Sequence, residues 1–363
     1  MIRLTKPLLA AEELAEVALV LNSGYLSRGP KVVEFEGAIA SYLGVKHAIA
    51  VSSGTAALHL SVLALGLEPS DEVIVPDFTF PATANAVVLA GSKPIFCDIG
   101  LNSFNLDPDE VERAITRHTK ALIPVHQFGL AAEMEAISKL ARERGIIIIE
   151  DAACSLGAAY RGQKCGTFGL VSCFSFHPRK ITTTGEGGVV VTNDDRIAAK
   201  IRALRHHGMD DGDFSFPGFN YRMSDLNAAV GVAQMRRITD LIESRRKLAT
   251  AYRSALSQVA GVRLPQDLDH AKHTYQSYVI LLDNVFDRDG VMARLADRGI
   301  ETTIGTYAIH RTKFYSQRQD LNTASLSRSA TAYEKSITLP LYPEMSLEQV
   351  YYVCDSLIGV LEA

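Results

Sequence analysis

The sequence predicts an α/β protein with a large lobe built on a mainly parallel β-sheet and a smaller C-terminal α+β lobe. Between about residues 45 and 195, seven short apolar runs alternate with helix-like stretches: HAIAVS, EVIVP, PIFCD, ALIPV, IIIIED, VSCFSF and GVVVT. Apolar runs rich in Ile and Val, separated by helices, are typical of parallel strands that helices cover on both faces. A chain of 363 residues is also long enough to form two lobes.

The helices of the large lobe are expected between these strands, at residues 55–67, 107–116 and 133–145. After about residue 225 the pattern changes to a long helical run over residues 225–256, which we expect to connect the lobes. The strand-like stretch YQSYVILL, the helix-like stretch DGVMARLADRGI and a last helix near SLEQVYYVCDSLIGVLEA follow. We therefore expect a cofactor-binding lobe over residues 1–240 and a small lobe over residues 241–363.

Composition narrows the classes of function and partner. Hydrophobic residues make up 47% and charged residues 21%, which is an ordinary globular balance. The formal net charge of −4 and the lack of a basic stripe argue against a nucleic-acid partner. The N-terminal stretch is apolar but interrupted by glutamates, so it predicts an amphipathic helix, with no signal peptide or membrane span.

The five cysteines are scattered and form neither a CxxC pair nor a metal-ligand spacing. This odd, scattered set favours reduced thiols in the cytoplasm, and no metal site is expected.

The first candidate site segment is VSSGTAALHL, residues 51–60, in which a strand ends and an Ala-rich helix begins. The free N–H groups and positive dipole of such a helix end form a phosphate cradle. Gly54 permits a close backbone approach and Thr55 offers a hydroxyl donor. The alternative is an ordinary Ser/Thr helix cap without a ligand.

Phe78 and Phe80 follow the second strand and precede a helix expected to start near Pro81. An aromatic side chain at the carboxyl end of a strand can lie against a planar ligand ring. The alternative is that these rings only fill the core.

Glu150 and Asp151 end the most apolar strand of the chain. A carboxylate there is costly unless it meets a positive partner, and a protonated pyridine nitrogen is such a partner. The alternatives are a helix cap or a salt bridge within the fold.

The segment SFHPRKITTTGEGG, residues 175–188, places Ser175, His177 and Lys180 directly after another strand. A partly desolvated lysine has a lowered pKa and forms a Schiff base with an aldehyde. The alternative is a solvated surface lysine. A phosphate cradle, a stacking ring, a strand-end acid and a lysine on one parallel sheet together predict a pyridoxal-phosphate site.

These motifs resemble the DegT/DnrJ/EryC1/StrS family of pyridoxal-phosphate sugar aminotransferases. The resemblance rests on SGTAALHL, PDFTFPATANAV, EDAACSLGA, SFHPRK with GEGG, and GFNYRMSDLNAAVG, and it covers nearly the whole chain. It implies the aspartate aminotransferase-like fold of type I, with a seven-stranded sheet, and a homodimer with shared active sites. It also implies glutamate as amino donor, a keto sugar linked to a nucleoside diphosphate as acceptor, and pyridoxamine phosphate as the intermediate cofactor form.

The resemblance also implies roles for individual residues. Lys180 matches the Schiff-base lysine and Asp151 the partner of the pyridine nitrogen. The other matches are the stacking aromatic Phe80, the phosphate contacts Gly54, Thr55 and Ser175, and Asn220, which matches a residue that reaches the phosphate from the partner subunit.

Cys154 departs from the family pattern, which commonly has glutamine or histidine there, near the phenolic oxygen of the cofactor. A thiol is a poorer hydrogen-bond partner, which puts that contact in doubt. Some family members have histidine in place of the lysine and catalyse a dehydration instead. Lys180 argues against that chemistry here.

The segment at residues 298–315 resembles the family's small-lobe stretch near the substrate. The candidates there for sugar or diphosphate contacts are His310, Tyr307 and Tyr315, and further candidates near the N-terminus are Tyr25, Arg28 and Lys31. Ordinary loop packing is the alternative for each of them. Arg179 and Arg222 could also meet anionic groups, and the sequence does not choose between them.

The leading interpretation is a nucleotide-sugar aminotransferase. One alternative is a pyridoxal-phosphate aminotransferase that acts on a keto sugar without a nucleotide, or on a cyclitol. The other is a non-catalytic regulator with the same fold, and the presence of both Lys180 and Asp151 argues against it.

Overall fold

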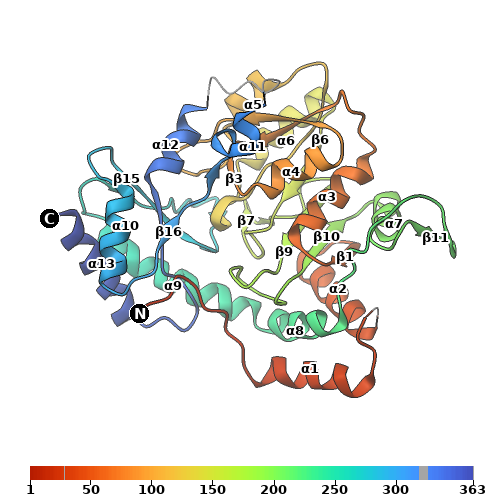
Figure 1. Cartoon of the computed structure of the whole chain (residues 1–363), viewed down its shortest axis with the longest axis horizontal. Helices are drawn as coiled ribbons and strands as arrows, with labels where there is room; N and C mark the ends of the chain where they lie inside the picture. Colours follow the sequence, from red (N-terminus) through yellow and green to blue (C-terminus); the bar gives the residue numbers. More distant parts are fainter. Residues whose placement is uncertain (28, 319–325, 363) are drawn as a thin grey trace.

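The centre of the molecule is a seven-stranded sheet (Figure 1), seen in a computed structural model that describes residues 1–27, 29–318 and 326–362. The strand order is β1 (His47–Val51), β10 (Gly188–Thr192), β9 (Val171–Ser175), β6 (Ile147–Asp151), β5 (Thr119–Leu122), β2 (Glu72–Pro76) and β4 (Lys93–Cys97). β10 is antiparallel to both of its neighbours, and every other adjacent pair is parallel. The seven apolar runs form these seven strands, so the mainly parallel sheet is confirmed.

Helices cover both faces of this sheet, because alternate side chains of each strand point to opposite faces. On one face, residues such as Ile149 and Cys173 pack against α3 (Gly54–Leu65), α4 (Ala82–Leu89) and α7 (Asp195–Leu204). On the other face, residues such as Phe174 and Ile148 pack against two helix pairs. These pairs are α2 (Pro30–Leu43) with α8 (Asp225–Arg236), and α5 (Pro108–Ala114) with α6 (Met134–Arg144).

The N-terminal helix α1 (Ala11–Ser23) lies along α8 at the lower edge of the molecule (Figure 1). The predicted helical run over residues 225–256 is two helices, α8 and α9 (Ile238–Leu256), which meet at Arg237. None of the helices in the described part of the chain is long and apolar enough to cross a membrane.

The C-terminal lobe has its own sheet, with the strand order β13 (Val262–Arg263), β15 (Tyr278–Leu282), β18 (Ser336–Leu339) and β16 (Thr303–Ile304). α9, α10 (Arg288–Asp297) and α13 (Leu347–Leu361) pack around it, and α12 (Ser327–Lys335) precedes β18. Ile2 and Leu4 also lie here, because Ile2 pairs with Ile300 and Leu341 N donates to Leu4 O. The first residues of the chain thus pack with the small lobe, and the boundary near residue 240 stays a prediction.

Short strands connect the two lobes. β17 (Tyr307–Ala308) pairs with β3 (Phe78–Thr79), and β14 (Ala271–Lys272) pairs with β7 (Ala159–Tyr160), which also pairs with β8 (Gln163–Lys164). The β17–β3 pairing brings the candidate substrate segment at residues 298–315 against the aromatic stretch that contains Phe80. The remaining short elements are η1 (Gln127–Gly129), β11 (Met209–Asp210), β12 (Asp213–Phe214), η2 (Ile309–Arg311) and α11 (Lys313–Ser316).

Candidate active site

The carboxyl ends of β1, β9 and β6 lie at one edge of the large sheet. β1 and β9 are both antiparallel to β10 and therefore run in the same direction, and β6 is parallel to β9. The three segments that follow these strands contain Gly54, Asp151 and Lys180. The topology therefore brings together candidates that are up to 126 residues apart in the sequence.

The turn after β1 forms the expected helix start. Ser53 caps α3, with its Oγ accepting from Ala56 N at 3.1 Å, and the following Thr55 is exposed. Gly54 packs directly on the end of β9, since an added Cβ would lie 2.7 Å from the Cβ of Ser175. Only glycine permits this approach, which places Ser175 beside the first turn of α3.

Lys180 is partly buried and lies in a turn after β9, with its backbone N–H donating to His177 O at 2.8 Å. Its Nζ donates to Cys154 Sγ at 3.0 Å. Cys154 is also the only one of the five cysteines that is not fully buried. The residue that departs from the family pattern therefore contacts the candidate lysine directly.

Asp151 is buried on the α3 and α4 face of the sheet. Its carboxylate accepts from Thr83 Oγ1 at 2.7 Å and from Ala153 N at 3.2 Å. Burial raises the pKa of Asp151, and these two hydrogen bonds and the charge of Lys180 offset that effect only in part. A buried carboxylate with a raised pKa gains most from an additional positive partner.

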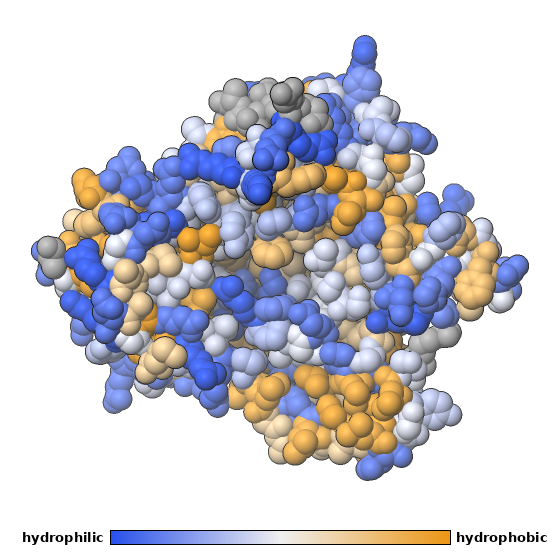
Figure 2. All heavy atoms as spheres, viewed as in Figure 1, coloured by the Kyte–Doolittle hydropathy of each residue, from blue (hydrophilic) through white to orange (hydrophobic). Residues whose placement is uncertain are grey.

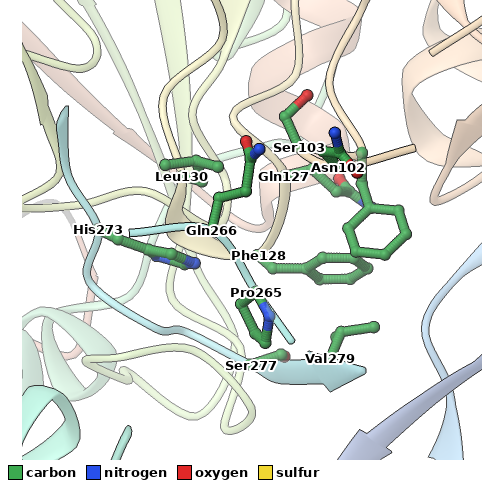
Figure 3. A pocket seen from close by; sticks show the side chains of 11 residues that line it. Asn102, Ser103, Gln127, Phe128, Leu130, Pro265, Gln266, His273, Ser277 and Val279 are labelled. Atoms are coloured by element: carbon green, nitrogen blue, oxygen red, sulfur yellow. The ribbon is translucent and has the colours of Figure 1, made fainter. Parts of the chain in front are cut away.

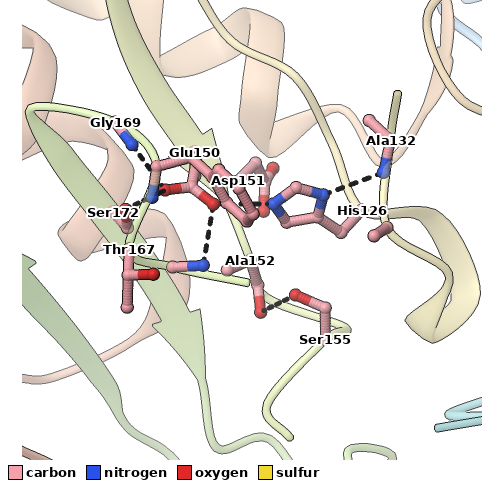
Figure 4. Close-up of polar contacts among 12 residues, drawn as sticks. His126, Ala132, Glu150, Asp151, Ala152, Ser155, Thr167, Gly169 and Ser172 are labelled. Carbon is pink, nitrogen blue, oxygen red and sulfur yellow. Dashed lines mark hydrogen bonds and ion pairs between the residues drawn. The ribbon is translucent and has the colours of Figure 1, made fainter. Parts of the chain in front are cut away.

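Glu150, which is adjacent in sequence, points to the opposite face and is fully engaged within the protein (Figure 4). It accepts from His126 Nε2, and four further donors come from the segment at residues 166–172: Gly166 N, Phe168 N, Gly169 N and Ser172 Oγ. Burial alone would raise the pKa of Glu150, but its hydrogen-bond donors keep it below the usual value of 4.5. The structure therefore favours the salt-bridge alternative for Glu150.

The two phenylalanines also differ. Phe78 is fully buried and packs against Phe104 and Phe128, so it belongs to the core. Phe80 is 62% exposed, with its ring centroid 6.3 Å from that of Tyr307. Only Phe80 therefore has a face available for a ligand ring.

The small-lobe candidates take different positions. Both the backbone N–H and the imidazole Nδ1 of His310 bond to the buried carboxylate of Asp77, the ring at 2.6 Å. Tyr307 is partly exposed beside Phe80. Tyr315 is buried, and its hydroxyl donates to Asn85 Oδ1 at 2.7 Å, which favours packing over substrate contact.

Two further candidates lie at the surface, and one lies outside the described residues. Tyr25 and Asn220 are exposed, and Asn220 pairs with His206 through an isolated β-bridge. Arg28 lies outside the described residues.

Two cavities lie away from this cluster. A cavity of about 10 Å³ between residues 102–104, 127–130 and 265–279 has room for about one water molecule (Figure 3). A hollow of about 790 Å³ beside β7, β8 and β14 shares no lining residue with the surroundings of Lys180. Neither cavity is therefore the candidate active site.

Sequence reasoning missed three residues that hold the candidates in place. These are Thr83, which bonds Asp151, Asp77, which bonds His310, and His126, which bonds Glu150. Thr83 lies within an Ala- and Val-rich helix and has no motif around it. Among these three, only Asp77 had a signal in the sequence: it is an acid directly after a strand, β2, as Asp151 is an acid at the end of β6.

These residues fit pyridoxal phosphate. The site offers the Lys180 amine for a Schiff base, the buried Asp151 carboxylate as acceptor for a ring nitrogen, and a helix start with Thr55 and Ser175 for a phosphate. The approach of Gly54 to Ser175 leaves no room for a Cβ and so narrows the cradle around that helix start.

The model of the DegT/DnrJ/EryC1/StrS aminotransferase family matches residues 7–358. GDP-perosamine synthase of Caulobacter vibrioides is 40% identical over 316 residues, which cover 85% of each chain. The crystal structure of the aminotransferase TlmJ from Streptoalloteichus hindustanus has 34% identity and a TM-score of 0.95, covering 100% of this chain and 99% of that one.

The PLP-form of the putative sugar aminotransferase Spr1654 from Streptococcus pneumoniae is 26% identical, with a TM-score of 0.94. The match covers 99% of this chain and 98% of that one. These likenesses confirm the expected type I fold and the cofactor, pyridoxal phosphate. The chain is a member of the DegT/DnrJ/EryC1/StrS family of pyridoxal-phosphate-dependent sugar aminotransferases.

Proposed function

We propose that this protein transfers an amino group from glutamate to the keto group of a nucleotide-linked deoxy sugar. The observation that carries the proposal is the cluster of Lys180, Asp151, Phe80 and the Gly54–Ser175 cradle at one edge of the sheet. The likeness to GDP-perosamine synthase supports a nucleotide-linked acceptor, since the name of that relative includes a nucleoside diphosphate.

Each residue has a defined task. Thr55, Ser175 and the first N–H groups of α3 bind the cofactor phosphate, and the exposed ring of Phe80 lies against the cofactor ring. When bound, pyridoxal phosphate supplies an electron sink for removal of a proton next to the amino group. Asp151 accepts from the ring nitrogen and keeps its proton in place.

Lys180 Nζ holds the cofactor covalently and later moves a proton. With the cofactor bound, the Lys180 amine would be placed to accept a proton at Nζ and to donate it again, as base and then acid. Cys154 Sγ, which accepts from this amine, keeps it at the site. His310 and Tyr307 are the proposed sugar contacts, and Tyr307 lies beside Phe80.

We also propose a homodimer in which Asn220 approaches the cofactor phosphate in the site of the partner, while Tyr25 is a proposed substrate contact. Several large apolar side chains are exposed on and after α1, including Leu14 at 72%, Leu19, Leu21, Leu26 and Val33. Figure 2 shows an apolar surface at the lower edge of the molecule, where α1 lies in Figure 1. A continuous exposed apolar surface supports an interface with another chain. A cytoplasmic location stays a prediction from the cysteine pattern.

A panel of keto nucleotide-sugars with glutamate tests the activity. The expected result is release of 2-oxoglutarate with at least one nucleotide-linked ketone and none with the same sugar lacking its nucleotide. Turnover of only the free keto sugar or a keto cyclitol would instead support the alternative acceptor. For the dimer, light scattering should give twice the chain mass, and a mass of one chain would contradict it.

A further inference from the structure

The peptide group directly before Lys180 is held by hydrogen bonds at both of its polar atoms. Its carbonyl oxygen, Arg179 O, accepts from the side-chain amide Nε2 of Gln276 at 2.8 Å. Its N–H, on Lys180, donates to His177 O, also at 2.8 Å. Because a peptide group is planar, these two bonds fix the orientation of the whole plane. The rotation about the N–Cα bond of Lys180 is then what remains to turn its side chain relative to that plane.

The two partners of this peptide come from different parts of the molecule. His177 belongs to the same turn as Lys180, so its bond is local. Gln276 lies 97 residues beyond Arg179 and two residues before β15, a strand of the small-lobe sheet. The side chain of Gln276 therefore connects the start of the small lobe to the turn that contains the candidate lysine.

Gln276 is itself held in place. It is buried, and its backbone carbonyl accepts from Arg245 Nη1 at 3.1 Å. The same nitrogen donates to Leu341 O at 3.1 Å, and Arg245 is fully buried. The Gln276 Oε1 atom accepts from Ser277 Oγ at 3.2 Å, which leaves the amide NH₂ for Arg179 O. Both the backbone and the side-chain amide of Gln276 therefore have fixed positions.

The segment that contains Gln276 packs directly on the large lobe at Gly129. Thr274 N donates to Gly129 O at 3.1 Å. Gly129 has a φ of 96°, and an added Cβ there would lie 2.4 Å from Thr274 Oγ1 and 3.0 Å from Gln276 N. Only glycine permits this approach. Contacts with both lobes thus determine where Gln276 lies relative to Lys180.

We propose that Gln276 is a positioning residue for Lys180, an inference that rests on the proposed covalent role of that lysine. A lysine amine is carried on a long, flexible stem, so its aim depends on where the stem begins. Gln276 fixes the peptide at the base of the stem, and Cys154 Sγ accepts from the amine at its tip. A reacting group that is held at both ends stays in the geometry that its chemistry requires, and a displacement of about 1 Å can cost a rate factor of about 10².

The rate at which the cofactor-free protein attaches pyridoxal phosphate tests this role. Attachment joins Lys180 Nζ to the aldehyde carbon and releases one water molecule, so its rate depends on where the amine lies. Stopped-flow growth of the visible absorption gives a first-order rate constant at saturating cofactor and the cofactor concentration at half the maximal rate. The first reports the aim of the amine, and the second reports cofactor binding. The thermal midpoint of each protein reports its folding.

Two substitutions of Gln276 separate its donor from its size. Gln276→Glu keeps the size and an acceptor for Ser277 Oγ, and its ionised carboxylate cannot donate to Arg179 O. Gln276→Met keeps an unbranched side chain and loses both polar groups. The matched control is Thr274→Val, which removes the hydroxyl bond to Gly129 O in the same segment and leaves the bonds of the Lys180 peptide intact.

The expected result is a first-order rate constant roughly tenfold or more lower in both Gln276 variants and within about twofold of wild type in Thr274→Val. The half-saturating cofactor concentration should stay within about twofold in all of them, because the phosphate contacts at the start of α3 are unchanged. If one Gln276 variant has lost its fold, the other decides.

Three outcomes would overturn the inference. A wild-type rate constant in a folded Gln276 variant would show that the amide does not aim the lysine. An equal fall in Thr274→Val would assign the effect to general packing between the lobes. Failure of wild type to attach the cofactor at all would overturn both this inference and the proposed role of Lys180, whereas the first two outcomes leave that role intact.

Discussion

Glu150 and Asp151, at the end of β6, lie on opposite faces of the sheet and have different roles. Glu150 faces a closed region, where five donors satisfy its carboxylate. Asp151 faces the candidate active site, where two donors bond to its carboxylate and the charge of Lys180 also favours its ionised form. Their pKa values move in opposite directions for this reason. The difference teaches that a buried strand-end acid is structural when the protein supplies its donors, and available for a cofactor when the protein supplies few.

On the side of β6 that faces the candidate active site, the substitution with the largest expected effect is Lys180→Ala. Removing the amine should lower turnover by at least roughly 10³-fold, because the covalent attachment and the proton carrier are lost together. The measurement is 2-oxoglutarate release, together with the visible absorption of the cofactor. Lys200→Ala, an exposed lysine on α7, is the matched control. Full turnover by Lys180→Ala would remove its proposed role.

Asp151→Asn should lower turnover by roughly 10²-fold or more, since an amide no longer keeps the ring nitrogen protonated. Stability should move the other way in the cofactor-free protein. The pKa of Asp151 is raised in the folded protein above its usual value of 3.8. The ionised carboxylate therefore lowers the free energy of unfolding fully above the raised pKa, and this loss disappears below pH 3.8. Cofactor-free Asp151→Asn should therefore be at least as stable as wild type near pH 8, by urea unfolding. A clear loss of stability there would contradict the raised pKa.

Glu150→Gln should have the opposite profile, with a loss of about 3 kcal/mol of unfolding free energy and kcat per bound cofactor within about threefold of wild type. The folded pKa of Glu150 is lowered, so its contribution is present above pH 4.5 and is lost as the pH falls through that lowered pKa. The difference between variant and wild type should thus shrink on acidification. A large fall in kcat with unchanged stability would mean that Glu150 acts in the chemistry.

A substitution with a smaller expected effect at the candidate active site is Thr83→Val. It removes one of the two hydrogen-bond donors to Asp151 and keeps the side-chain shape. We expect the free energy of binding of pyridoxal phosphate to weaken by about 1 kcal/mol. The measurement is cofactor retention in dialysis, which should be several-fold weaker. Thr331→Val, on the exposed surface of α12, is the control. Unchanged retention would show that Thr83 does not position Asp151.

The smallest effect is expected for Tyr315→Phe. It removes only the hydroxyl that bonds Asn85, so stability should fall by about 1 kcal/mol while KM for the sugar stays unchanged. A raised KM for the sugar would instead support Tyr315 as a substrate contact, the role for which it was a candidate from the sequence.

Much of the fold could be predicted because its signals are local. The apolar runs and the residues that follow them identified all seven strands of the large sheet, and the matched motifs identified the family. The break of the run at residues 225–256 into α8 and α9 was not visible, because both helices have the same helical pattern. The roles of individual residues were harder, as Phe78 and Phe80 show, since both are phenylalanines at the end of the same strand.

The sequence by itself determined the order of strands and helices, the position of each polar residue after its strand, and the aminotransferase family. Only the tertiary structure decided that Glu150 is satisfied and Asp151 is available, that Cys154 contacts Lys180, and that Gln276 bonds the peptide before Lys180. The physical reason is that alternation along a strand assigns a side chain to one face of the sheet, whereas the donors and charges on that face come from segments far away in the chain.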